Sequence, residues 1–223
     1  MRLVILGAPG AGKGTQASLL AEFYHCPHVS TGDIFRKAIA EDTQMGREAD
    51  RHISQGRLVP DEITIELVKQ RIEEPDCQYG FVLDGYPRTQ NQAVRLDEIL
   101  RQKCLYLNKA IQIELGEDEI YRRLANRRVC TDCGATYHLD SLPPKTPGIC
   151  DLCGSALIQR DDDNDETIKE RIIVYHKLTE PVLSYYKKQG SLLVTSGEGD
   201  ILDVHKTIIN SLETRSLRAN DSH

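Results

Sequence analysis

Short apolar runs alternate with longer amphipathic segments along this chain. Runs of the length expected for buried strands stand at 3–6, 27–29, 81–83, 110–115 and 192–194. Apolar side chains recur at helical spacing at 16–24, 61–73, 89–100 and 167–186. Pro181 is expected to kink or end the last of these helices, because it has no backbone N–H to donate. Alternating strands and helices predict an α/β fold in which a parallel sheet is covered by helices on both faces.

Two stretches break this alternation and are interpreted as insertions into the sheet domain. Residues 30–59 are charged and mostly helical in pattern. Residues 126–163 carry several prolines and four cysteines but almost no apolar side chains, so something other than burial must hold them together. The polar tail at 216–223 is expected to be frayed.

Composition narrows the class of protein. The 223 residues carry a net charge of −6, which argues against broad nucleic-acid binding, since that requires an excess of basic surface. The first residues lead directly into a predicted core strand, and no apolar run approaches the roughly 18 residues of a membrane span. These features predict a cytoplasmic protein without a membrane segment.

The first strand runs directly into the sequence GAPGAGKGT at 7–15, which has the composition of a phosphate-binding loop. Glycines permit close approach of backbone N–H groups to anionic oxygens, and the following helix adds its N-terminus. Lys13 supplies a cation for β- and γ-phosphates. Gly14 stands where Ser or Thr is usual and Thr15 follows it, so direct ligation of Mg²⁺ by a hydroxyl is less assured. The alternative is a tight turn with a surface lysine.

Four of the seven cysteines form two Cys-x-x-Cys pairs, with sixteen residues between the pairs. They are Cys130, Cys133, Cys150 and Cys153. This spacing is typical of a zinc ribbon, and four thiolates leave no open position, so the predicted role is structural. Redox-active or chance thiols are the alternative, and His138 is a competing ligand. The other three, Cys26, Cys77 and Cys104, are expected to be small buried hydrophobic residues.

The segment FVLDGYPRTQ at 81–90 ends a strand in a carboxylate, at the edge where parallel sheets bind ligands. Asp84 can hold Mg²⁺ through water, because Mg²⁺ keeps much of its hydration shell. Arg88 offers a planar fork for phosphate. Taken alone, Asp84 could also cap the following turn.

Arginines are concentrated in the second half of the chain. A helix over 117–128 would place Arg123 and Arg127 on one face, with Arg122 and Arg128 pointing elsewhere. Arg160 and Arg171 flank an acidic run at 161–166. Solvated faces are the alternative for any single arginine, but an acidic protein that gathers arginines beside a phosphate loop is expected to neutralise a highly charged substrate.

In this order, the loop, the aspartate segment and the cysteine insertion resemble the adenylate kinases, specifically the long bacterial type with a metal-bearing lid. The resemblance extends to about residue 210 and rests on GAPGAGKGT at 7–15, STGD at 30–33, GRLVPDE at 56–62, DGYPRT at 84–89 and NRRV at 126–129. Gly-Thr after the lysine is the norm in that family. Tyr86 replaces a common phenylalanine.

The resemblance implies a P-loop nucleoside-monophosphate kinase fold with two inserted mobile domains. The core would comprise 1–29, 60–125 and 164–223, the nucleoside-monophosphate-binding domain 30–59, and the lid with its zinc ribbon 126–163. Implied catalytic residues are Lys13, Arg88, Arg123, Arg127, Arg160 and Arg171. ATP would contact Gly10, Ala11, Gly12, Lys13, Gly14, Thr15, Arg127, Thr136, Tyr137 and Gly199. AMP would contact Thr31, Arg36, Arg57, Leu58, Val59, Gly85, Tyr86, Pro87, Arg88, Gln92, Arg160 and Arg171.

The implied reaction is reversible transfer of a phosphoryl group from MgATP to AMP, which gives two ADP. The resemblance also implies a monomer with a structural Zn²⁺. The attacking phosphate oxygen is already anionic, so no general base is assigned. Alternatives are a kinase specific for UMP or CMP, a GTP:AMP enzyme, and a nucleic-acid-binding ATPase. The last is disfavoured because 131–155 has few basic or aromatic residues.

Overall fold

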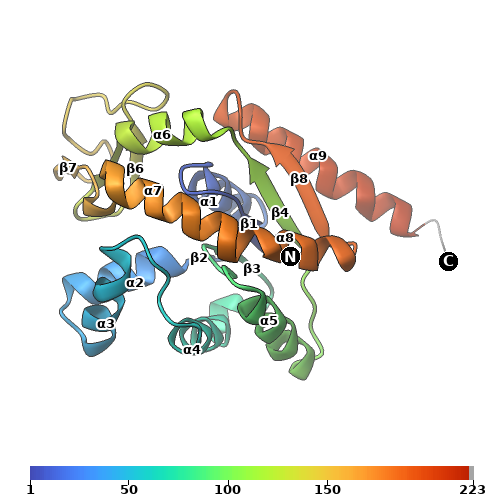
Figure 1. Ribbon diagram of the computed structural model, residues 1–223. Coiled ribbons are helices and arrows are strands. Elements are labelled where there is room, and N and C mark those ends of the chain that lie inside the picture. Colours follow the sequence, from blue (N-terminus) through green and yellow to red (C-terminus); the bar gives the residue numbers. More distant parts are fainter. Residues whose placement is uncertain (221–223) are drawn as a thin grey trace.

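The computed structural model describes residues 1–220, and only the backbone of residues 215–220. Its main sheet has five parallel strands in the order β2-β3-β1-β4-β8 (Figure 1). The strands are β1 (Arg2–Leu6), β2 (His28–Ser30), β3 (Phe81–Asp84), β4 (Lys109–Glu114) and β8 (Leu192–Ser196). Val4 at the centre of β1 pairs with Leu83 on one side and Ala110 on the other. Every predicted strand is therefore present, within two residues of its expected bounds.

Helices cover both faces of this sheet because successive side chains of a buried strand point to opposite faces. Leu3 and Ile5 belong to the core beneath α1 and α9, whereas Val4 and Leu6 belong to the core beneath α4, α5 and α8. The bounds are α1 (Lys13–Phe23), α4 (Asp61–Ile72), α5 (Gln90–Gln102), α8 (Glu180–Lys188) and α9 (Ile201–Asn220). The α/β prediction is confirmed.

The first insertion is a helical pair, α2 (Thr31–Ala40) and α3 (Gln44–Ile53). The side chains of Ser30 and Thr43 cap the two helices by accepting backbone N–H groups. The pair crosses closely at Gly46, where an added Cβ would lie 2.0 Å from the carbonyl oxygen of Ala38. A side chain there would force the helices apart, so glycine permits the crossing.

The second insertion begins where α6 (Glu117–Asn126) ends, at the left of Figure 1. It contains an antiparallel sheet in the order β6-β5-β7. Its strands are β5 (Arg127–Cys130), β6 (Thr136–His138) and β7 (Leu157–Ile158). Among the described residues, the buried members of its core are Cys130, Tyr137 and Cys150. This confirms the prediction that apolar burial is scarce in this segment.

The helical stretch after the second insertion changes its hydrogen bonding before Pro181. α7 (Asp165–Val174) passes into a π-helical turn, η3 (Tyr175–Thr179), and then into α8. The proline sits in the first turn of α8, where its missing N–H costs least. The predicted interruption is confirmed. Two short 3₁₀ helices, η1 (Pro75–Cys77) and η2 (Asp161–Asp163), complete the elements of the described chain.

Three expectations require correction. α6 ends at Asn126, and Arg127 begins β5, where it pairs with His138, so a shared helical face of Arg123 and Arg127 is wrong. Cys77 is buried, but Cys26 is half-buried and Cys104 is exposed in the turn after α5. The backbone of 216–220 continues the helix α9, where the sequence predicts a polar tail, and residues 221–223 lie outside the described residues. Among the described helices, none has both the length and the apolar character to cross a membrane.

Candidate active site

The loop between β1 and α1 forms the floor of a large cavity. Gly10 and Gly12 adopt positive φ values of 80° and 91°, and Gly12 is the N-cap of α1. A Cβ on Gly10 would lie 3.0 Å from the side chain of Leu124 in α6, so the loop is packed tightly beneath that helix. This conformation leaves the N-terminus of α1 available for an anion, as predicted.

Lys13 opens α1, and its Nζ donates to the carbonyl oxygen of Ala8 at 2.7 Å. The pKa of Lys13 is lowered to about 7, mainly by burial and also by the nearby charges of Arg88 and Arg171, whereas Asp84 opposes the shift. The ammonium group is therefore poorly stabilised without an anionic ligand. A polyphosphate at the loop would stabilise it.

Asp84 ends β3 next to this lysine. Its Oδ2 lies 3.6 Å from Nε2 of His28, and Nδ1 of His28 lies 3.1 Å from Oγ of Ser18. Burial alone would raise the pKa of Asp84, but interaction with His28 and the charge of Lys13 outweigh it and lower the pKa. An ionised carboxylate beside a phosphate loop is the donor type that Mg²⁺ prefers, so the residues present fit the predicted magnesium site.

The cavity has a volume of about 970 Å³ and is lined by cationic side chains from between positions 13 and 171. Its arginines are Arg36, Arg57, Arg88, Arg122, Arg123, Arg127, Arg160 and Arg171. The Nε atom of Arg160 is buried without a hydrogen-bond partner. Burial, with the charges of Arg127 and Arg36, lowers the pKa of Arg160 to about 9. This concentration of positive charge calls for a highly anionic ligand.

Nearly all the site residues proposed from the sequence line this one cavity. They include residues 10–15, Thr31, Arg36, residues 57–59, Asp84, Gly85, Arg88, Gln92, Arg123, Arg127, Thr136, Tyr137, Arg160, Arg171 and Gly199. Tyr86 and Pro87 do not line it and are buried. The Oη of Tyr86 donates to the backbone oxygen of Gln92 at 3.1 Å, so this residue supports the wall of the cavity from behind.

One end of the cavity lies between α2 and the carboxyl end of β3. Thr31 is 2% exposed, and its Oγ1 donates to the carbonyl oxygen of Gly85 at 3.0 Å. Nε of Arg88 donates to the same oxygen at 2.8 Å. Arg36 pairs with Asp33 within α2. Arg88 therefore has its Nε held by the backbone, while the loss of hydration lowers its pKa.

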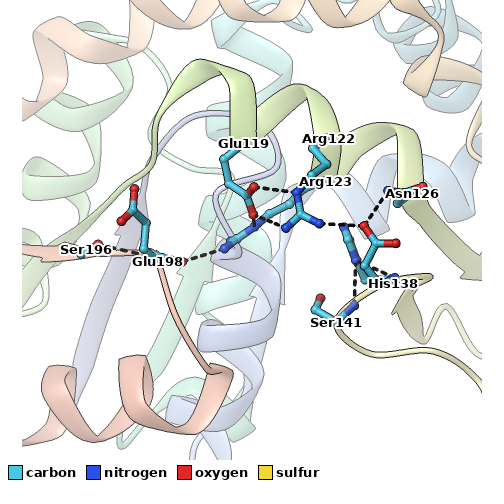
Figure 2. Close-up of polar contacts among 10 residues, drawn as sticks. Glu119, Arg122, Arg123, Asn126, His138, Ser141, Ser196 and Glu198 are labelled. Atoms are coloured by element: carbon cyan, nitrogen blue, oxygen red, sulfur yellow. Dashed lines mark hydrogen bonds and ion pairs between the residues drawn. The ribbon is translucent and has the colours of Figure 1, made fainter.

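At the other end, Glu119 of α6 holds two arginines (Figure 2). It accepts from Nε of Arg122 at 2.7 Å and from Nε of Arg123 at 2.8 Å. Nη2 of Arg123 also donates to the carbonyl oxygen of Gly197 at 2.9 Å, which ties α6 to the loop after β8. The hydrogen bond to Arg122 is the main reason why the pKa of Glu119 falls to about 2. Arg122 lines the cavity, contrary to the expectation that it points elsewhere.

Arg122 also connects α6 to the second insertion. Its Nη1 and the Nδ2 of Asn126 donate to Oδ2 of Asp140 at 2.7 and 2.8 Å. Nδ1 of His138 accepts the backbone N–H groups of Asp140 and Ser141 (Figure 2). Sequence reasoning missed the roles of Glu119 and Asp140. Glu119 stands three and four residues before Arg122 and Arg123 in one helix, a spacing that indicates such a contact, whereas the donors to Asp140 come from another element.

The four predicted metal ligands are brought together. The Sγ atoms of Cys130, Cys133, Cys150 and Cys153 lie within 4.8 Å of one another, and His138 is not in this group. The closest pairs are Cys130 with Cys153 at 3.3 Å and Cys133 with Cys150 at 3.5 Å. A tetrahedral zinc ion with Zn–S bonds of about 2.3 Å requires sulfur separations of about 3.8 Å. The cluster therefore fits such an ion with small adjustments.

Comparisons with known proteins agree with this geometry. The family model for adenylate kinase matches residues 5–191. The chain is 51% identical over 212 residues to an adenylate kinase of Acetivibrio thermocellus, covering 95% of this chain and 98% of that protein. It is 50% identical to one of Clostridium tetani, with the same coverage, and 46% identical to one of Streptomyces coelicolor, covering 96% of this chain and 99% of that protein.

Proposed function

Since this chain belongs to the adenylate kinase family, and is therefore a phosphotransferase that makes ADP from ATP and AMP, we propose that its cavity carries out direct transfer between the two nucleotides. The observation that carries this proposal is the concentration of arginines in the cavity that also contains Lys13, with the buried Nε of Arg160 left unpartnered. The parallel sheet flanked by helices is consistent with the P-loop nucleoside-monophosphate kinase fold.

We assign the donor ATP to the phosphate loop. Residues 10–15 would hold its phosphates, and Lys13 would contact the β- and γ-phosphates. Arg123 and Arg127, with Thr136, Tyr137 and the backbone near Gly199, would surround the base and ribose. The hydrogen bond from Arg123 to the carbonyl oxygen of Gly197 supports this assignment, because it joins α6 to the loop that contains Gly199.

We assign the acceptor AMP to the end formed by α2 and β3. Thr31, Arg36 and Arg88 would hold it, the backbone of 57–59 and Gln92 would approach its base, and residues 85–87 would form the wall behind it. Arg160 and Arg171 would lie between the two nucleotides, where negative charge develops during transfer.

The proposed chemistry depends on positioning and charge rather than on proton transfer. An AMP phosphate oxygen is already anionic, so in-line attack on the γ-phosphorus needs no general base. Lys13 and the arginines would stabilise the charge that spreads over the equatorial oxygens. Exclusion of water is also required, because otherwise ATP would be hydrolysed.

The proposed metal roles differ. Asp84 would hold Mg²⁺ through water, and the ion would neutralise phosphate charge when bound. The four cysteines would hold Zn²⁺ with no open position, which makes that ion structural. The scarce apolar core of the second insertion supports this role, since the metal would replace burial.

Domain motion is part of the proposal. The core would be 1–29, 60–125 and 164–223, with 30–59 closing over AMP and 126–163 closing as a lid over ATP. Lid opening would then limit turnover. The resemblance further supports a monomer in the cytoplasm, and the net charge of −6 supports the absence of a nucleic-acid partner.

A nucleotide panel tests the proposed function. Initial rates would be measured with ATP or GTP as donor and with AMP, UMP, CMP or GMP as acceptor, each with Mg²⁺. We expect ATP with AMP to give the highest kcat/KM, and Lys13→Met to lower kcat by at least about two orders of magnitude. Preference for another acceptor, or hydrolysis without transfer, would contradict the proposal.

A further inference from the structure

Asp61 is the hydrogen-bonding centre of a polar cluster behind the acceptor end of the cavity. It opens α4, two residues after Val59. Its Oδ1 accepts from Nε2 of Gln92 at 2.7 Å. Its Oδ2 accepts from Oγ1 of Thr89 at 2.8 Å and from Nδ2 of Asn91 at 2.9 Å. A single carboxylate therefore joins the start of α4 to the start of α5.

These contacts fix which way the amide of Gln92 points. Oε1 of Gln92 accepts the backbone N–H of Arg88 at 2.7 Å, while Nε2 donates to Asp61. A backbone N–H can only donate and an ionised carboxylate can only accept. Rotating the amide by 180° would place its NH₂ group against the N–H of Arg88 and its oxygen against the carboxylate of Asp61, and neither pair could form a hydrogen bond. Gln92 is 2% exposed and lines the cavity, so its amide cannot satisfy itself with bulk water instead.

We infer that Asp61 is a positioning residue that makes the acceptor-base site a hydrogen-bond donor. With one N–H of Gln92 donated to Asp61 and one lone pair of its oxygen bound to the N–H of Arg88, the amide keeps one N–H that can donate into the cavity, together with the second lone pair of Oε1. Such a site favours a base whose ring nitrogen accepts a hydrogen bond over one whose ring nitrogen carries a hydrogen. This inference rests on the proposed function, because it concerns the acceptor nucleotide of the same cavity.

The consequence is a choice between closely similar purines. The N1 atom of adenine is an acceptor, whereas N1 of hypoxanthine, the base of inosine monophosphate (IMP), carries a hydrogen. Opposite a fixed N–H, IMP would place donor against donor and leave both groups without a partner. A site discriminates more strongly against an analogue that leaves buried polar groups without hydrogen-bond partners than against one that only fits an apolar pocket poorly.

The rival explanation is that Asp61 only stabilises its helix. It lies in the first turn of α4, where an acidic side chain interacts favourably with the helix N-terminus. That role would change thermal stability but not the relative use of two bases. A ratio of rate constants therefore separates the two explanations.

The experiment compares kcat and KM for AMP and IMP, with ATP as donor, in four proteins whose folding is checked by thermal melting. Asp61→Ala removes the acceptor, and we expect the ratio of kcat/KM for AMP over IMP to fall by at least about tenfold, mainly through KM for AMP. Asn91→Ala removes another donor to the same carboxylate and leaves Gln92 bound. For this matched control, we expect a ratio within about twofold of the unaltered protein.

A paired exchange keeps the inference testable if Asp61→Ala does not fold. The double variant Asp61→Asn with Gln92→Glu exchanges the positions of the carboxylate and the amide, so the net charge is conserved. The new amide at 61 donates to the new carboxylate at 92, which then presents an acceptor to the cavity. We expect the AMP over IMP ratio to fall by about a hundredfold relative to the unaltered protein.

An unchanged ratio in folded Asp61→Ala, or in the double variant, would overturn the inference. An equal loss of the ratio in Asn91→Ala would also overturn it, because the carboxylate would then not act through Gln92. If the unaltered protein fails to transfer phosphate to AMP, the proposed function fails instead, and the two failures are distinguished within one data set.

Discussion

The buried carboxylate of Asp163 accepts two hydrogen bonds from the guanidinium of Arg127, from Nε to Oδ2 at 2.8 Å and from Nη2 to Oδ1 at 2.5 Å. The same Oδ1 accepts from Nη1 of Arg171 at 2.9 Å. Asp163 closes the second insertion, Arg127 opens it and Arg171 lies on α7. A single acidic side chain therefore joins both ends of the insertion to the core helix and balances two of the cavity's arginines.

Replacing Asp163 should therefore weaken the fold and strengthen the response to nucleotide. Removing one partner of a buried ion pair costs about 3–5 kcal/mol, because the remaining charge is left without compensation. For Asp163→Ala, we expect a loss of about this size in urea unfolding and a larger rise in Tm on adding ATP than in the unaltered protein. Asp161→Ala, at an exposed neighbour, serves as the control. This expectation assumes that Asp163 and the phosphates of ATP compete for Arg127 and Arg171, and equal ATP-induced shifts in Tm would contradict it.

Nucleotide binding should take up a proton through Lys13. The pKa of about 7 for this group in the ligand-free protein means that it is largely neutral at pH 8. A polyphosphate would raise that pKa and hence protonate the amine. Calorimetry of ATP binding in buffers of different ionisation enthalpy should show nearly one proton more taken up by the unaltered protein than by Lys13→Met. Equal proton uptake by the two proteins would show that Lys13 is not the group that becomes protonated.

The four-cysteine cluster should hold one zinc ion per chain, detectable by elemental analysis. Chelation or Cys150→Ser should lower Tm by loosening the second insertion, because little apolar core remains to hold it. Cys104→Ser, at an exposed cysteine outside the cluster, is the matched control and should leave Tm unchanged. Catalysis should survive at low temperature. Complete inactivity of metal-free protein whose insertion is still protected from hydrogen exchange would assign the metal to the chemistry instead.

The contact of His176 with two acidic side chains should make stability depend on pH. Its Nδ1 lies 2.9 Å from Oε2 of Glu180, and its Nε2 lies 3.1 Å from Oε1 of Glu117. The hydrogen bond to Glu180, with that to Glu117, raises the pKa of His176 above its ordinary value of 6.5. The folded state therefore favours the charged ring. This contribution is complete below that ordinary value and is lost as pH rises through the raised pKa.

Urea unfolding of the unaltered protein and of His176→Gln at several pH values checks this sign. The unaltered protein should be the more stable of the two near pH 6, and its advantage should shrink as pH increases to 9. A difference between them that does not vary with pH would show that the ring acts only through packing.

Local sequence was sufficient for the features that depend on neighbouring residues. The loop at 7–15 needs glycines within a few positions of one another, and each pair of cysteines needs a two-residue turn. Continuous apolar runs predict buried strands because both faces of a parallel sheet are covered. These requirements are written in adjacent positions, so the sheet, the phosphate loop and the metal cluster could be predicted, and a family resemblance added the expected nucleotides.

The tertiary structure decided what depends on distant partners. The four-residue spacing of Arg123 and Arg127 predicts one helical face. Arg127 instead lies in β5, because its backbone pairs with that of His138. Asp163 and Asp61 carry no local signal, and each acquires its role from donors on other elements. The sequence by itself determined which chemical groups are present and how the chain folds locally. Only the packed fold determined which of those groups are paired, because hydrogen bonds and charge interactions fall off within a few ångströms whatever the separation along the chain.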